Sequence, residues 1–164
     1  MSIIVTGSFI LTELNEAQLI DLSFNIQKLA LSYRLGISLG ANVTGYTVSR
    51  AQSNYLDFQL SDDPLDDKSE YLFSGDGIKI KVGDFEEPRS ESLKIRMSRL
   101  YNFFESVFST ELVEKIILNI DLDKNEKINV INIRVDEFIS TILSLFKMND
   151  NWTPSLQIII NQSN

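Results

Sequence analysis

The periodicity of the apolar residues is the feature that most constrains what this chain can fold into. Three segments, residues 19–33, 93–107 and 139–146, carry apolar side chains at the spacing of an amphipathic helix. Most other apolar runs alternate with polar residues at a period of two, which is typical of a strand with one buried face. Such strands are expected at residues 3–11, 43–50, 55–60, 71–73, 78–85, 115–122, 128–133 and 155–161.

The order of these elements predicts the fold class. Strands outnumber helices, and short turn segments such as "AQSN" and "SGDG" separate neighbouring strands. We therefore predict an α+β fold, with a largely antiparallel sheet covered by about three helices. No linker, internal repeat or low-complexity run divides the chain, so residues 1–164 are expected to form a single globular domain.

Polar residues predict where the helices begin. Asn15 is the expected N-cap of the first helix and Gln18 completes a capping box, while Gly36 is expected to end that helix. Ser90 and Asp136 are the expected caps of the second and third helices. The expected buried stripes are Leu19, Leu22, Ile26, Leu29 and Tyr33, then Leu93, Met97, Leu100, Phe104 and Val107, then Ile139, Ile142, Leu143 and Phe146.

The chain contains neither cysteine nor histidine. The first absence excludes disulfides, thiolate metal sites and cysteine nucleophiles. The second excludes Ser-His-Asp triads and most zinc sites, and leaves catalysis to carboxylate, lysine, tyrosine or arginine groups. We therefore expect no catalytic residue, no cofactor and no metal ligand, and the chain is not expected to be an enzyme.

The stretch "NIDLDKNEKINV" starts like a calcium-binding EF-hand loop, with Asp121, Asp123 and Asn125 at alternating positions. Such a loop needs glycine at its sixth position and a bidentate carboxylate at its twelfth, but Glu126 and Asn132 occupy them. The favoured interpretation is a strand with a solvated face, followed by "DKNE" as a hairpin turn. Asp121 and Asp123 remain open as a magnesium-binding catalytic pair, although no nucleophile or phosphate clamp is evident beside them.

Negative charge is concentrated between Ser61 and Glu87. This segment has nine acidic residues against three lysines, so it carries −6 of the chain's formal net charge of −8. One interpretation is solubility, and the other is an anionic face that attracts a basic protein and repels nucleic-acid phosphates. The candidate partner-binding residues are Asp62, Asp63, Asp66, Asp67, Glu70, Tyr71, Asp76, Asp84, Glu86 and Glu87.

The N-terminal stretch "MSIIVTGSFIL" has no basic region and its apolar run is interrupted, so it predicts a strand and not a signal peptide. No segment approaches the roughly 18 consecutive apolar residues of a membrane span. We therefore expect a cytoplasmic protein whose partner is neither a membrane nor a nucleic acid.

Small size, strong acidity, the missing catalytic residues and an α+β layout together resemble bacterial toxin-immunity proteins, the partners of contact-dependent growth inhibition toxins or of colicin-type nucleases. The resemblance covers the general character of the whole chain. It implies a cognate protein toxin, often a basic nuclease, that is bound and blocked by occlusion through the acidic face.

Three other functions remain open. One is a different inhibitor or adaptor, such as a phage-encoded mimic of nucleic acid. Another is a magnesium-dependent hydrolase that uses Asp121 and Asp123, and the last is a structural role in an assembly.

Overall fold

In the computed structural model of the chain, the described residues are 5–40, 55–61, 87–120, 128–148 and 156–163. Six strands in these ranges form one sheet, in the order β2-β3-β1-β4-β6-β5. They are β1 (Val5–Leu11), β2 (Gly36–Leu39), β3 (Tyr55–Ser61), β4 (Val113–Ile120), β5 (Asn129–Arg134) and β6 (Leu156–Asn161). All neighbours are antiparallel except β5 and β6, which are parallel. The predicted α+β class, with a largely antiparallel sheet, is confirmed.

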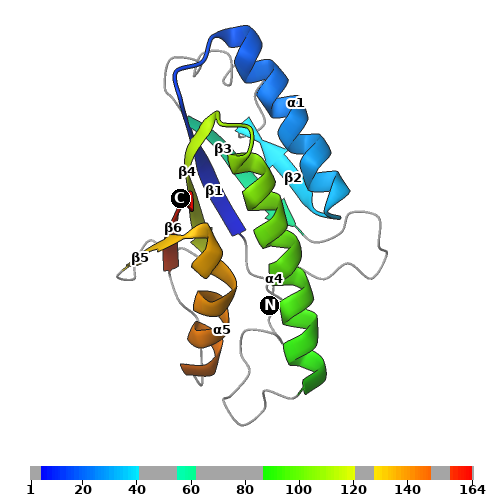
Figure 1. Cartoon of the computed structure of the whole chain (residues 1–164), viewed down its shortest axis with the longest axis vertical. Helices are drawn as coiled ribbons and strands as arrows, with labels where there is room; N and C mark the ends of the chain where they lie inside the picture. The colour runs from blue at the N-terminus through cyan, green and yellow to red at the C-terminus, as the bar shows by residue number, and fades with distance from the viewer. Residues whose placement is uncertain (1–4, 41–54, 62–86, 121–127, 149–155, 164) are drawn as a thin grey trace.

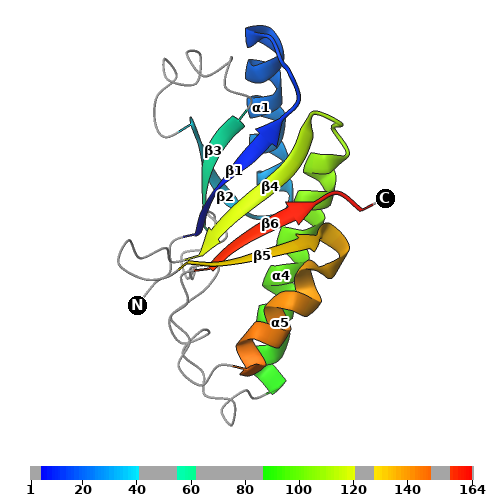
Figure 2. The same cartoon turned by 90° about the vertical axis from the view of Figure 1, so that its left-hand side faces the viewer.

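The described ranges contain three α-helices, and all of them lie on the same face of the sheet (Figure 1, Figure 2). They are α1 (Glu16–Ser32), α4 (Glu87–Phe108) and α5 (Phe138–Met148), the last preceded by the 3-10 turn η4 (Val135–Glu137). The opposite face carries none of the described helices, and we call it the open sheet face.

The hydrophobic core lies between the sheet and the helices, and a row of aromatic rings crosses it. Phe9 of β1 stacks on Phe58 of β3 with ring centroids 4.4 Å apart. Phe9 also meets Phe103 of α4 edge-on, and Phe103 lies beside Phe104. Phe104 in turn contacts Phe138 of α5 at 5.5 Å. These contacts connect α4 to both the sheet and α5.

Helix α1 begins as predicted and ends differently. Gln18 N–H donates to Asn15 Oδ1 at 2.8 Å, and Asn15 N–H donates to Gln18 Oε1 at 3.0 Å, so the capping box is confirmed. Gly36 does not end the helix, which stops at Ser32. Arg34 instead takes the left-handed conformation, with φ 60°, and Gly36 begins β2, a strand that was not expected.

The predicted apolar stripes are confirmed wherever their side chains are described. The buried members are Leu19, Leu22, Ile26, Met97, Leu100, Phe104, Val107 and Ile142, and the partly buried ones are Leu29, Tyr33, Ile139 and Leu143. The side chains of Leu93 and Phe146 lie outside the described part of the structure.

Two predicted helix caps are wrong. Helix α4 starts at Glu87, so Ser90 lies inside it. The third helix follows a 3-10 turn whose cap is Arg134, because the backbone N–H of Arg134 donates to the Glu137 carboxylate at 2.9 Å. Asp136 lies within that turn and forms an ion pair with Arg134 at 3.3 Å.

The hairpin predicted across "DKNE" is also wrong, because β4 and β5 are not neighbours. Strand β6 lies between them, antiparallel to β4 and parallel to β5. Ile158 and Ile160 of β6 are fully buried, whereas Val130 of β5 is exposed. The more apolar strand therefore takes the inner position, where both of its edges are hydrogen-bonded. Asp121 and Asp123 themselves lie outside the described residues.

The other predicted strands fall into two groups, one that is confirmed and one that lies outside the described residues. The strands expected at residues 3–11, 55–60, 115–122, 128–133 and 155–161 are confirmed within a few residues at their ends. Those expected at 43–50, 71–73 and 78–85 lie outside the described residues.

Candidate functional site

The open sheet face is formed by the strand residues that alternate with the core residues. In β1, Phe9 is buried whereas Thr6 and Ser8 are half-buried. Strands β3 and β4 alternate in the same way, which places Asp57 and Asn119 on the open sheet face. Polar side chains from three adjacent strands therefore share one surface.

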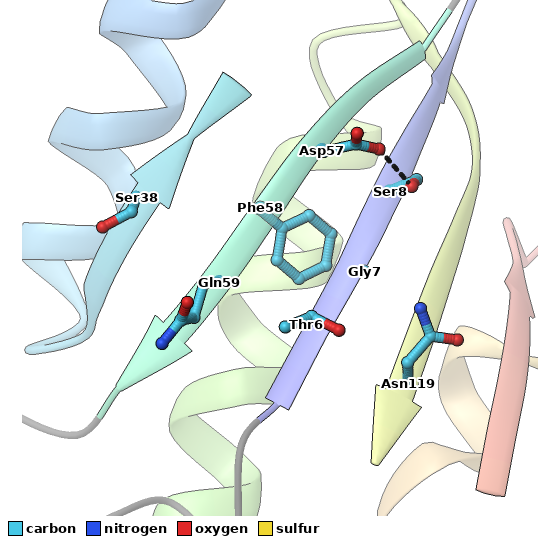
Figure 3. A pocket seen from close by; sticks show the side chains of 8 residues that line it. All are labelled: Thr6, Gly7, Ser8, Ser38, Asp57, Phe58, Gln59 and Asn119. Carbon is cyan, nitrogen blue, oxygen red and sulfur yellow. Dashed lines mark hydrogen bonds between the residues drawn. The ribbon is translucent and has the colours of Figure 1, made fainter. Parts of the chain in front are cut away.

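A hollow of about 330 Å³ opens on this face, across β2, β3, β1 and β4 (Figure 3). Its lining residues are Ser38 of β2, Asp57, Phe58 and Gln59 of β3, Thr6, Gly7 and Ser8 of β1, and Asn119 of β4. The register brings them together, because Ser38 pairs with Gln59, and Thr6 pairs with both Gln59 and Asn119. We call this site the polar hollow.

Asp57 gives the polar hollow its charge. Ser8 Oγ donates a hydrogen bond to Asp57 Oδ1 at 2.7 Å, and the two residues are opposed across β1 and β3 (Figure 3). Among the described residues that line the hollow, Asp57 is the one that is ionisable, and none is a lysine or an arginine. Asp57 therefore contributes negative charge to the described lining of the polar hollow.

A second hydrogen bond orients the side chain of Asn119, which lines the β4 side of the polar hollow. Gln157 Nε2 of β6 donates to Asn119 Oδ1 at 2.9 Å, between residues opposed across β4 and β6. The amide group of Asn119 then presents its N–H donors to other partners. Polar side chains thus follow one another across the open sheet face, from Ser38 of β2 to Gln157 of β6.

Gly7 and Phe58 contribute the apolar wall of the polar hollow. They are opposed in the register of β1 and β3, and the Phe58 ring lies between the two strands beside Gly7 (Figure 3). Because Gly7 has no side chain, the ring that stacks on Phe9 in the core also reaches the hollow.

Apolar residues continue the open sheet face beside the polar hollow. Ile117 of β4 is opposed to Ser8 on one side and to Ile159 of β6 on the other. Ile10 of β1 lies one row further along the same face, and all three isoleucines are half-buried. A polar site next to half-buried apolar side chains matches the mixed composition of protein–protein interfaces.

The acidic residues predicted to bind a partner lie almost entirely outside the described ranges. Glu87 is the exception, as the first residue of α4, and its side chain is not described. Strand β3 ends at Ser61, so in sequence the acidic segment (residues 62–87) begins three residues after Gln59 of the polar hollow.

Sequence reasoning missed the residues of the polar hollow. The stretch "TGSF" in β1 lacks the Gly-x-Ser-x-Gly pattern of a nucleophile elbow, so it carries no catalytic motif. The available signal was the alternation of polar Thr6 and Ser8 with buried neighbours, repeated by Asp57 and Gln59 in β3. That signal predicts an open face, but which polar residues meet depends on strand order and register.

A separate apolar stripe lies on α1. Ile20, Phe24 and Leu31 fall on one side of the helix and are exposed, with 61% of Phe24 accessible. The opposite side of α1 packs into the core through Leu19 and Leu22. This stripe therefore faces away from the sheet, and it is not part of the polar hollow.

The described residues contain no metal-binding cluster and no candidate membrane-spanning helix. Within those ranges, no group of three or more acidic side chains is placed to hold a metal ion. None of the described helices combines the length and the apolar character needed to cross a membrane.

Known proteins give no further guidance. No protein-family model matches the chain, and neither a curated protein nor a solved structure matches it.

Proposed function

We propose that this chain is an immunity-type protein, which binds a basic, nuclease-type protein toxin and blocks it by occlusion. The observation that carries the proposal is that the polar hollow includes Asp57 of β3, the strand whose last residue, Ser61, is followed directly by the acidic segment. An acidic side chain on β3 and a long acidic segment directly after that strand in sequence favour one cationic partner over two unrelated ones.

Electrostatics supports a fast and salt-sensitive association. The stretch from Ser61 to Glu87 carries −6 of the chain's −8 formal charge. Clustered charge of one sign steers an oppositely charged protein over distances of about 8 Å at physiological salt, the screening length there. The same charge lowers the affinity for nucleic acid, because it repels phosphates.

The size of the open sheet face supports a shared interface. Six strands about 4.8 Å apart, with about six residues each at about 3.3 Å, present roughly 500 Å². A stable interface buries about 800 Å² on each partner. The open sheet face alone is therefore too small, and the acidic segment would have to supply the remaining contact.

The test begins with the tagged chain as bait in a lysate of its source organism, followed by purification of the retained basic protein. We expect one such protein in near-equal amount, and we expect the chain to suppress its toxicity when both are produced in one cell. Association rates are then measured against salt for the wild type and for a variant with four substitutions. These are Asp62→Asn, Asp63→Asn, Asp66→Asn and Asp67→Asn.

We expect the four-fold variant to associate roughly ten-fold more slowly at low salt and to show a flatter salt dependence. A control variant loses the same charge away from the acidic segment, through Glu13→Gln, Glu16→Gln, Asp21→Asn and Glu114→Gln. Its association rate should change much less. The proposal fails if no basic protein is retained at any salt, if toxicity persists, or if both variants behave alike.

A further inference from the structure

We propose that the exposed side of α1 is a self-association surface, on which α1 of a second copy of this chain packs antiparallel. The surface is formed by Ile20, Phe24, Gln27 and Leu31, and we call it the exposed α1 stripe. The proposal goes beyond the immunity-type function, because it concerns the helical layer and leaves the open sheet face uncovered.

The spacing of the exposed α1 stripe is that of a coiled-coil seam. Its residues follow one another at intervals of four, three and four, which are the alternating d and a positions of a heptad abcdefg. Ile20 is 43% exposed, Leu31 57% and Phe24 61%. The core-facing side of α1 is already filled by other residues, so this second apolar row is available to another helix.

The stripe lies on the flank of α1 that faces away from the neighbouring helix. The Tyr33 hydroxyl shares a hydrogen bond with Ser106 of α4 at 2.7 Å, so α4 packs on the side of α1 that carries Tyr33. Tyr33 follows Phe24 by nine residues, which is about two and a half helical turns and places the two on opposite sides. In Figure 1, α1 is the outermost of the described helices, with α4 beside it and α5 beyond α4. A helix of a second copy would therefore extend this layer past α1.

The charges beside the stripe are complementary to those of a second, antiparallel copy. Asp21 and Lys28 occupy the two e positions that flank the stripe, and both are exposed. If Phe24 packs opposite Gln27 of the second copy, the e positions of the two helices face each other, and Asp21 meets Lys28 of the second copy. Two-fold symmetry repeats every contact, so this ion pair forms twice.

The same register also aligns the apolar ends of the stripe. It places Ile20 opposite Leu31 of the second copy, and the reverse contact follows by symmetry. A parallel pair in register would instead bring Glu16, at a g position, beside Asp21 of the second copy. Because those two side chains carry like charges, the antiparallel arrangement is favoured.

The size of the contact predicts a weak, reversible dimer. Helix α1 has 17 residues, so it is about 25 Å long and about 10 Å wide and offers roughly 250 Å² of planar contact. A stable interface buries about 800 Å² on each partner. The formal net charge of −8 on each copy also opposes association. We therefore expect a dissociation constant of roughly 0.1–1 mM.

The test is analytical ultracentrifugation of the full-length chain at physiological salt, from about 10 µM to about 1 mM. We expect the average mass to rise from that of a monomer toward that of a dimer. Phe24→Ala removes one ring from each half of the interface and should weaken self-association roughly ten-fold or more. Ile95→Ala, the control, shortens an equally exposed side chain on α4 and should leave the affinity within about two-fold of the wild type.

Reversing one charge at a time tests the ion pairs. Asp21→Lys and Lys28→Asp should each weaken self-association roughly ten-fold, because each substitution places like charges together twice. The two substitutions change the net charge in opposite directions, so a general charge effect would shift their affinities in opposite directions. An equimolar mixture of the two variants should associate about as tightly as the wild type, since unlike charges then meet in the mixed dimer. Glu114→Lys makes the same reversal on β4 and should change the affinity by no more than about two-fold.

The inference is overturned if the chain stays monomeric at the highest concentration, which would leave the stripe to a different partner. It is also overturned if Phe24→Ala and Ile95→Ala have equal effects, or if mixing Asp21→Lys with Lys28→Asp does not restore association. None of these measurements involves a toxin. Failure of self-association therefore leaves the proposed function standing, and failure to neutralise a toxin leaves the self-association standing.

Discussion

Gly7 and Phe58 are directly opposed in the central sheet, and their spacing leaves no room for a larger residue at position 7. A Cβ atom added to Gly7 would lie 2.5 Å from Cζ of Phe58 and would collide with the carbonyl oxygen of Ile117. An aromatic ring opposite a strand glycine compensates for the missing side chain by covering the backbone. The pair therefore combines a packing role with the apolar wall of the polar hollow.

Gly7→Ala should destabilise the protein by roughly 1–3 kcal/mol, as overpacking of a close-packed interior does. One side of the clash is the backbone of β4, which moves less readily than a side chain. Urea unfolding followed by circular dichroism measures the change. Ser38→Ala, on an exposed edge-strand residue, is the control, and it should alter stability by no more than about 0.5 kcal/mol. Equal effects of the two substitutions would contradict the packing seen here.

Phe104→Ala should cost about 3–5 kcal/mol of unfolding free energy, because it leaves a cavity between α4 and α5. Phe104 is fully buried and contacts both Phe103 and Phe138. Phe24→Ala makes the same chemical change on α1, where the ring is 61% exposed, and should cost no more than about 0.5 kcal/mol. Thermal and urea unfolding of both variants give the comparison. A large loss of unfolding free energy in Phe24→Ala would contradict the exposure of this ring and would mean that it is covered in solution.

Asn15→Ala should destabilise the protein by about 1 kcal/mol, because it removes the acceptor for the Gln18 N–H at the start of α1. The first turn of the helix would then have one more unpaired donor. The control is Asn25→Ala at an exposed position inside α1, where alanine has the higher helix propensity and the change should be neutral or slightly stabilising. Differential scanning calorimetry compares the two melting temperatures. If the Asn15 cap contributed nothing to stability, the Asn15→Ala and Asn25→Ala variants would have the same Tm.

The Tyr101 phenol should titrate above its ordinary pKa of 10.0, chiefly because its hydroxyl donates to Glu105 at 2.8 Å. Partial burial and the negative charges of Glu105 and Asp136 raise the pKa of Tyr101 further. Because the folded state favours the neutral phenol, this contribution to stability is complete below pH 10. It is lost as the pH rises through the higher folded pKa.

Ultraviolet titration of tyrosinate, compared between the wild type and Tyr101→Phe, isolates this group among the five tyrosines. In the Glu105→Gln variant the pKa of Tyr101 should fall toward 10.0, because the acceptor is no longer charged. An unchanged titration in Glu105→Gln would show that the contact with Glu105 does not control the phenol.

The elements that could be predicted are those set by neighbours in sequence. The capping box of Asn15 and Gln18 involves residues three apart, and the stripe of α1 recurs within single helical turns. Such interactions depend on local geometry, so the sequence pattern is sufficient to predict them. The errors at Gly36 and Asp136 are of one kind, since a nearby residue takes each role: Arg34 adopts the left-handed conformation after α1, and Arg134 caps the 3-10 turn before α5.

The order of the strands in the sheet cannot be predicted from local sequence patterns. Adjacent segments β4 and β5 looked like a hairpin, yet the C-terminal β6 separates them. The alternation of each strand indicates which face is buried, but it does not indicate which strand lies beside it. The choice depends on how much apolar surface each arrangement buries across the whole sheet.

The sequence by itself determined the α+β class, the faces of the helices and the concentration of acidic charge between Ser61 and Glu87, because each follows from composition or local periodicity. Only the tertiary structure decided that Ser38, Asp57, Thr6 and Asn119 line one hollow. These residues are far apart in the chain and meet through the register of four strands. That register is selected by the packing of the shared core, which no single segment specifies.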